Sequence, residues 1–126
     1  MDAWKRKTRR AARVSELIHE EVSEMLARGE IKDPRIGFVT ITAVKVSEDM
    51  QSCRIYVSVF GTEAQRQRAL DGLASASGYV RGVLAKRLRM KRVPKLVFVS
   101  DESLREAQRV DEILDSLKTS GDLSDE

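Results

Sequence analysis

Two runs of β-branched residues separated by a five-residue turn constrain the fold of this chain more than any other feature. Residues 38–47 (FVTITAVKVS) and 53–60 (CRIYVSVF) both have the composition of strands. A turn this short joins antiparallel neighbours, so the two runs predict a β-hairpin. The apolar alternation of the first run slips between Ile41 and Val44, which predicts a bulge or twist near Ala43.

The second run places different chemistry on its two faces. Cys53 alternates with Ile55 and Val57, and we therefore interpret it as a small core residue. Tyr56 and Phe60 fall on the opposite face. They fit either base-stacking platforms on an open sheet or residues of a sheet that is covered on both faces.

Helical periodicity surrounds the hairpin. Apolar residues in 8–28 recur at helical spacing, at Val14, Leu17, Ile18, Val22, Met25 and Leu26, and Gly29 is the expected C-cap. Residues 95–99 read as a short buried strand after Pro94. A last helix, capped by residues 100–103, carries an apolar stripe that we expect to dock on the core: Leu104, Ala107, Val110, Leu114 and Leu117.

The helical pattern of residues 62–92 contains three glycines, Gly72, Gly78 and Gly82. Each glycine inside a helix costs about 1 kcal/mol relative to alanine. A break at Ser77-Gly78 would use that freedom and would let another backbone approach closely. We therefore predict two helices that meet at a kink, with Thr62 and Gln65 forming a capping box at the start of the first.

Length and composition indicate one soluble domain. The chain has 126 residues, of which 41% are hydrophobic and 34% charged. We expect a flexible basic segment at residues 1–7, a globular domain at 8–118 and a flexible acidic tail at 119–126. The single cysteine, the lack of a signal sequence and the lack of a membrane-length apolar run favour the cytoplasm.

Positive charge is concentrated in one segment. Residues 81–95 hold seven basic side chains and no acid. On an ideal helix Arg81, Arg89 and Arg92 share one stripe opposite the apolar residues, while Arg87 falls among them with its stem packed. A helix of this kind is suited to phosphate binding. The alternative is a solvated helix face, although such faces usually mix both signs.

A second basic group lies at the N-terminus, where residues 1–13 hold six bases and one acid. Arg9, Arg10 and Arg13 occupy the first turns of a helix, where the dipole disfavours cations, which hints at a nearby anion. Trp4 either stacks on a base or packs locally. His19 and Cys53 are the only candidates for nucleophilic catalysis, and neither has a sequence partner that supports this chemistry.

Several segments together resemble the bacterial ribosome-binding factor A family. The resemblance covers about residues 8–117 and is carried by Arg13-Val14, Lys32-Asp33-Pro34-Arg35, the VTIT run with the following Val44, Val46, Ser47, Asp49 and Met50, Ile55–Ser58, Ala76–Arg81, Leu88–Lys91, Pro94, Leu96, Phe98, Asp101 and Ser103. Two positions depart from the family pattern: Met50 replaces a common leucine and Ala107 a common glycine.

The resemblance implies an α+β, type II KH-like domain. Its three-stranded mixed sheet is packed by helices in the order α-β-β-α-(kink)-α-β-α, and Ala76-Ser77-Gly78 stands where other KH domains have a GxxG loop. The family implies a monomeric, non-catalytic factor without cofactor or metal. Such a factor binds the free small (30S) ribosomal subunit and its 16S rRNA, assists late maturation of that RNA and supports growth in the cold.

Residues and resemblance together define an expected RNA surface. Its first part neutralises phosphates through Arg81, Lys86, Arg89, Lys91, Arg92 and Lys95. Backbone amides at Ala76, Ser77 and Gly78 form the second part, and a basic arm forms the third: Lys5, Arg6, Lys7, Arg9, Arg10 and Arg13. Three alternatives stay open: a general nucleic-acid-binding module, a protein–protein adaptor that uses the last helix, and a small enzyme.

Overall fold

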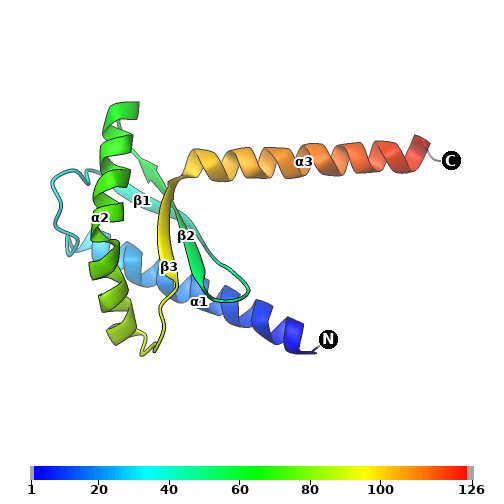
Figure 1. The fold of residues 1–126 in the computed structure, drawn as a ribbon. Coiled ribbons are helices and arrows are strands. Elements are labelled where there is room, and N and C mark those ends of the chain that lie inside the picture. The colour runs from blue at the N-terminus through cyan, green and yellow to red at the C-terminus, as the bar shows by residue number, and fades with distance from the viewer. Residues whose placement is uncertain (1, 125–126) are drawn as a thin grey trace.

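Three helices and three strands form the protein in a computed structural model of residues 2–124, in which the side chains of residues 2–8, 103–105, 107–108 and 118–124 are not described. In chain order the elements are α1 (Asp2–Ala27), β1 (Val39–Val46), β2 (Ser52–Val59), α2 (Glu63–Arg87), β3 (Lys95–Ser100) and α3 (Asp101–Ser124). Figure 1 shows α1 and α2 beside the sheet and α3 projecting away from it as a rod.

The sheet is mixed and has the order β1-β2-β3. β1 and β2 pair antiparallel as the predicted hairpin, with a register shift between Ile41 and Ala43 that confirms the predicted bulge. β2 and β3 run parallel, joined by α2. Beyond the bulge Val44 lies opposite Ile55 and Val46 opposite Cys53, so the apolar residues of both strands stay on one face.

α1 and α2 cover this single face. The core joins Ile18, Val22 and Met25 of α1 and Leu73, Val80 and Leu84 of α2 to the inward-facing residues of all three strands. Cys53 is fully buried in this core, as predicted. The α+β class that the resemblance implies is thus confirmed. α1 ends at Ala27, and the predicted Gly29 closes this end with a φ of +67°, where Glu30 N–H donates to Met25 C=O.

α2 is one continuous helix, so the predicted division into two helices at Ser77-Gly78 is wrong. Gly78 has no positive φ, and a Cβ built on it meets no atom within 4 Å. Gly72 is the glycine that packing requires, because its Cβ would lie 2.9 Å from Ile36 Cγ1. The predicted capping box is present: the Thr62 side chain accepts from Gln65 N–H and Gln65 Oε1 accepts from Thr62 N–H.

The two ends of the chain also differ from the prediction. α1 begins at Asp2 rather than Thr8, so residues 2–7 continue the first helix. α3 extends to Ser124, through most of the segment expected to be a flexible tail. Its apolar stripe does not dock on the core, because Val110, Leu114 and Leu117 are each more than half exposed. Leu104 and Ala107, which were assigned to the same stripe, have side chains outside the described set.

Candidate nucleic-acid interface

The concentration of positive charge lies where α2 ends and the chain turns toward β3. Leu88 is the C-cap, and Met90 N–H donates to Ala85 C=O, closing a Schellman-type end. Arg89 occupies the left-handed position of this motif with φ +53°. Glycine usually fills that position, because other residues are strained there by about 1–2 kcal/mol. Arg89 therefore holds backbone strain at this turn while its side chain is exposed.

Five exposed cations surround this turn and are here named the basic corner: Lys86, Arg89, Lys91, Arg92 and Lys95. Within the described part of the chain, none of the five forms an ion pair. The corner presents more positive charge than the fold itself neutralises. Long cationic side chains that are free in solvent suit the phosphates of a nucleic acid.

Arg81 holds the turn in place from the body of α2. Its Nη2 donates to Val93 C=O over 2.8 Å, which ties the connection between α2 and β3 back to the helix. Pro94 is fully buried directly after this bond. Arg81 is exposed and still contributes positive charge, but it is also a structural residue of the corner.

The predicted stripe of Arg81, Arg89 and Arg92 is not continuous. α2 ends at Arg87, so Arg89 and Arg92 belong to the connection and not to the helix. Arg87 lies beside the corner but is neutralised, because its guanidinium donates to Glu30 at 3.0 Å and to Glu21 at 3.4 Å. The hydrogen bond that Arg87 donates to Glu30 is the main cause of the raised pKa of Arg87. The predicted helical stripe is therefore wrong in its local structure, and the role of these residues in binding stays a prediction.

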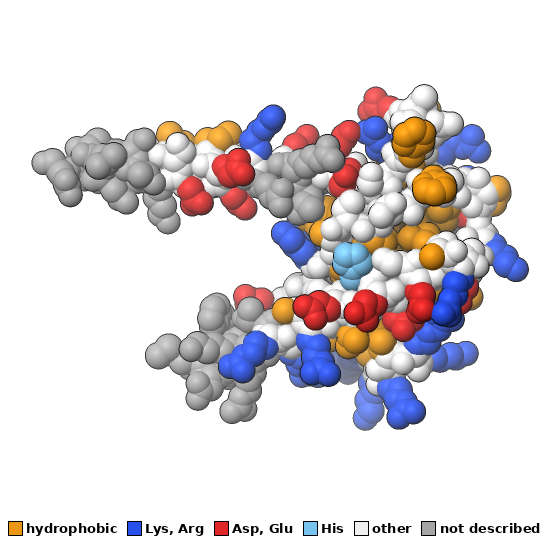
Figure 2. Space-filling view, turned by 180° about the vertical axis from the view of Figure 1, so that it is seen from behind, with side chains coloured by type: hydrophobic (Ala, Val, Ile, Leu, Met, Phe, Trp, Pro, Cys, Tyr) orange, Lys and Arg blue, Asp and Glu red, His pale blue; other side chains and the backbone are white. Residues whose placement is uncertain are grey.

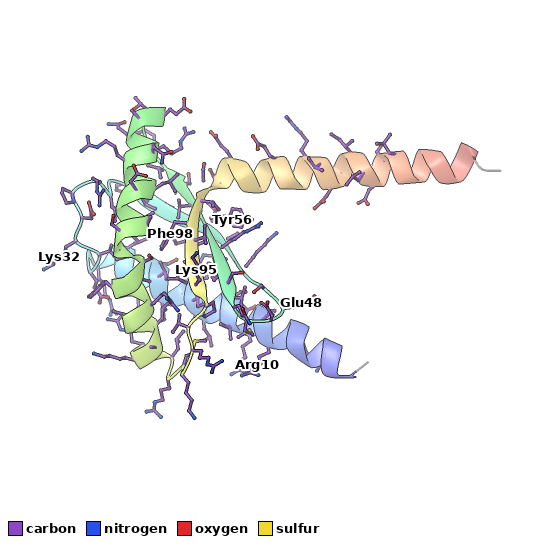
Figure 3. The ribbon with its side chains drawn as sticks, viewed as in Figure 1. Arg10, Lys32, Glu48, Tyr56, Lys95 and Phe98 are labelled. Carbon is purple, nitrogen blue, oxygen red and sulfur yellow. The ribbon has the colours of Figure 1, made fainter. Side chains whose placement is uncertain are left out.

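The N-terminal arginines reach the same end of the sheet. Ser15 of α1 accepts a 3.0 Å hydrogen bond from Val46 N–H, and Lys95 N–H donates to Gln51 C=O, so the end of β1 and the start of β3 lie close together. Arg9, Arg10 and Arg13 are exposed on the turns of α1 that lead to Ser15. Figure 3 shows Arg10 and Lys95 in the same lower half of the molecule. The side chains of Trp4, Lys5, Arg6 and Lys7 lie outside the described set.

Ala76, Ser77 and Gly78 lie in the middle of α2 and not at the basic corner. Gly78 precedes Leu88 by ten residues, which is about 15 Å along a helix. A continuous α-helix already uses its backbone N–H groups in hydrogen bonds. Contrary to the prediction, these residues therefore offer no free N–H groups. Ser77 Oγ donates to Ala74 C=O at 2.7 Å, and exposed Gly78 leaves an open patch on the helix surface.

Cys53 and His19, the two candidates for nucleophilic catalysis, lie in different surroundings. Burial raises the pKa of the Cys53 thiol to about 12, which removes the thiolate needed for attack. His19 lines an open hollow of about 450 Å³ between α1 and β1, together with Glu16, Lys45 and Glu48. No group of three His, Cys, Asp or Glu side chains in this part of the chain is arranged to hold a metal ion, and none of its helices is long and apolar enough to span a bilayer.

The sequence matches the model of a known protein family. The family model described as "Ribosome-binding factor A" matches residues 10–114. Ribosome-binding factor A of Brevibacillus brevis is 44% identical over 117 residues, which cover 93% of this chain and 96% of the relative. The chain belongs to the ribosome-binding factor A family.

Solved structures of the family share the fold. The crystal structure of the Thermus thermophilus factor matches with a TM-score of 0.61 and 31% identity, covering 71% of this chain and 94% of that one. A homology model of the Thermus thermophilus factor, fitted into a cryo-EM map of a 30S–RbfA complex, matches with a TM-score of 0.52 and 32% identity over 66% and 90% of the two chains. The type II KH-like, α+β architecture predicted from the resemblance is thereby confirmed.

Proposed function

We propose that this protein binds the free small ribosomal subunit through the phosphates of its 16S rRNA. The basic corner carries the proposal, because five cations that pair with no acid among the described side chains surround a turn in which Arg89 accepts backbone strain. Arg81 and the exposed arginines of α1 extend the positive surface. The relative fitted into the map of the 30S complex supports the small subunit as the partner.

The proposed mechanism is binding-linked reshaping of RNA during late 16S rRNA maturation. The sequence has no nucleotide-binding loop, so no ATP or GTP supplies energy. A protein of this kind favours one RNA conformation only by binding it better than its competitors. The same action explains a role in the cold, when misfolded RNA escapes slowly. The proposal describes a monomeric, cytoplasmic and non-catalytic factor.

A general nucleic-acid-binding module is the second candidate. The same five cations would bind any phosphate backbone, because phosphate contacts carry no sequence information. Competition separates the two functions. Duplex DNA in excess leaves the complex with free small subunits intact if the proposal is correct, and removes the protein from the subunit if binding is general.

The direct test is a matched pair of charge reversals. Lys91 and Arg92 are changed to glutamate in one variant, and Lys32 and Arg68, which are equally exposed but lie away from the corner, in the other. Loss of two phosphate contacts lowers the slope of log K against log salt by about 1.5–2 and the affinity for purified 30S subunits by roughly 30-fold or more. The control variant binds nearly as wild type. Equal losses in both variants would refute a local phosphate surface.

The cellular test uses the same two variants in a strain that lacks the factor. The variant with Lys91 and Arg92 reversed should not complement this strain. The strain should still grow slowly at low temperature and accumulate unprocessed 16S rRNA. The control variant should restore both growth and RNA processing. Rescue by the corner variant would show that RNA maturation does not depend on the basic corner.

A further inference from the structure

The face of the sheet that α1 and α2 leave open carries a row of cations, one from each strand. Alternate residues of a strand point to opposite faces, and Ile41, Ile55 and Phe98 point toward the helices. Lys45 of β1, Arg54 of β2 and Lys95 of β3 therefore point to the other face. All three side chains are exposed.

The strand register brings these charges together. Lys45 lies directly opposite Arg54 in the antiparallel ladder, an arrangement that destabilises a sheet because the charges repel. Lys95 is two residues before Val97, the parallel partner of Arg54, which places the two Cα atoms about 8 Å apart. Folding alone does not favour such a row.

No ion pair neutralises the row within the described residues. The outward-facing positions of the sheet are Thr40, Ala43, Lys45, Arg54, Tyr56, Ser58, Lys95, Val97 and Val99. Within the described residues, none of the three cations forms an ion pair. Asp49, in the adjacent turn, is already engaged, since it accepts from Ser47 Oγ and Gln51 N–H. The row keeps its full positive charge toward solvent.

Tyr56 and Val97 form the floor beneath the row. Lys45 Nζ lies 6.0 Å from the centroid of the Tyr56 ring, within reach of a cation–π contact. Tyr56 is only 4% exposed, so its ring supports the lysine and does not offer a platform for a base. This answers the question that the sequence left open for Tyr56. A charged row above a buried tyrosine ring fits a nucleic-acid backbone better than a stacked base.

We propose that Lys45, Arg54 and Lys95 form a second phosphate-binding surface, which takes the backbone of an RNA strand across the face of the sheet that α1 and α2 leave open. The inference rests on the proposed function and extends it, because Lys95 belongs to both surfaces and joins them at the start of β3. Three neighbouring cations that form no ion pair favour the phosphate backbone of a nucleic acid as the ligand. A protein surface would present charges of both signs.

The test replaces Lys45 or Arg54 by threonine, a residue that strands accommodate well. Each change should lower the affinity for purified 30S subunits roughly 5- to 10-fold near 100 mM salt and the salt slope by about 0.7–0.9. The melting temperature should stay or rise, because the repulsion across the ladder is removed. Lys32→Thr is the control, since Lys32 is exposed in the loop before β1, far from the row (Figure 3).

Two further measurements identify the cause of any loss. Arg54→Lys keeps the charge and should keep the binding, whereas an equal loss in Arg54→Lys and Arg54→Thr would overturn the charge argument. A photo-crosslinking amino acid in place of Val97, which is 40% exposed, should link to rRNA in the subunit complex. A link to a ribosomal protein, to a second copy of this chain or to neither overturns the proposal.

Failure of this inference is distinct from failure of the proposed function. If Lys91 and Arg92 reversal abolishes binding while Lys45→Thr and Arg54→Thr bind with an unchanged salt slope, only the second surface is refuted. If none of these variants weakens binding, the basic corner is refuted as well.

Discussion

The two long helices α2 and α3 have similar lengths but opposite surroundings. α2 has 25 residues, and its stripe, which includes Leu73, Val80 and Leu84, is fully buried against the sheet. α3 has 24 residues, and its stripe at Val110, Ile113, Leu114 and Leu117 is exposed. Figure 2 shows hydrophobic side chains along one edge of the α3 rod and acidic side chains along the other.

The difference arises from the sheet and not from the helices. The core of the domain lies on one face of the sheet, and α1 with α2 already fill that face. α3 starts at Asp101, directly after β3, when that face is occupied. The charge follows the same division, because residues 1–100 hold 20 bases and 11 acids, whereas residues 101–126 hold three bases and nine acids. Amphipathic spacing shows that a helix can bury a face, but the rest of the fold decides whether it does.

The largest expected effect compares one leucine from each helix. Leu84→Ala removes a fully buried side chain of α2 and should lower the free energy of unfolding by about 2–5 kcal/mol. Leu114→Ala changes a side chain that is 56% exposed and should alter it by less than about 0.5 kcal/mol. Urea unfolding of both variants measures the difference. A cost above 2 kcal/mol for Leu114→Ala would show that α3 packs on the domain in solution.

A second comparison lies within α2, between two glycines. Gly72→Ala forces a Cβ to 2.9 Å from Ile36 Cγ1 and should destabilise the protein by about 1–2 kcal/mol, because the loop before β1 must shift. Gly78→Ala meets open space in a regular helix and should stabilise it by about 1 kcal/mol. Thermal unfolding shows whether each substitution lowers or raises the stability of the protein. Destabilisation by Gly78→Ala would restore the predicted kink.

Local patterns predicted the elements better than their arrangement. The hairpin, the bulge at Ala43 and the cap at Gly29 depend on residues close in sequence, and all three are confirmed. The position of α3 depends on which faces of the sheet are already filled, and no short pattern contains that information. The kink failed for a related reason, because the glycine that packing needs is Gly72, whose contact is the distant residue Ile36.

The candidate site shows the same limit. A run of basic residues was enough to predict the basic corner, but the end of α2 at Arg87 was missed because Arg89 occupies a position typical of glycine. The row on the open face was not predicted. Lys45 lies opposite Arg54 only because of the bulge, since the register before it would place Lys45 opposite Cys53. One inserted residue therefore moves a cation from the core face to the surface.

A third prediction concerns the end of α2, where stability and binding are expected to oppose each other. Arg89→Gly relieves about 1–2 kcal/mol of left-handed strain, partly offset by the flexibility of glycine in the unfolded chain. The variant should gain about 0.5–1 kcal/mol in stability and lose roughly 5- to 10-fold in affinity for 30S subunits. Arg89→Gln is the control, which loses the charge and keeps the strain. A lower melting temperature for Arg89→Gly would show that the arginine stabilises the turn.

The smallest expected effect is the pH dependence of stability that arises in the loop packed against Gly72 of α2. No such loop packs against α3 in the described part of the chain. Asp33 accepts hydrogen bonds from the side chain and the N–H of Arg35, which lower the pKa of Asp33 to about 2 from its usual 3.8. A carboxyl group with a lowered folded-state pKa stabilises the protein above its unfolded pKa and loses that contribution as the pH falls toward the folded value. The stabilisation should be complete near neutral pH and disappear between about pH 5 and pH 2.

Asp33→Asn should therefore melt below wild type at pH 7, and the two melting curves should converge as the pH approaches 2. Asp111→Asn is the matched control on α3, because the Asp111 side chain is exposed and forms no ion pair with another residue that the structure describes. It should leave the melting temperature at pH 7 nearly unchanged. Thermal unfolding of all three proteins across this pH range measures the effect. A constant gap between wild type and Asp33→Asn down to pH 2 would show that the asparagine disturbs the packing of the loop on α2 and that the charge of Asp33 contributes nothing.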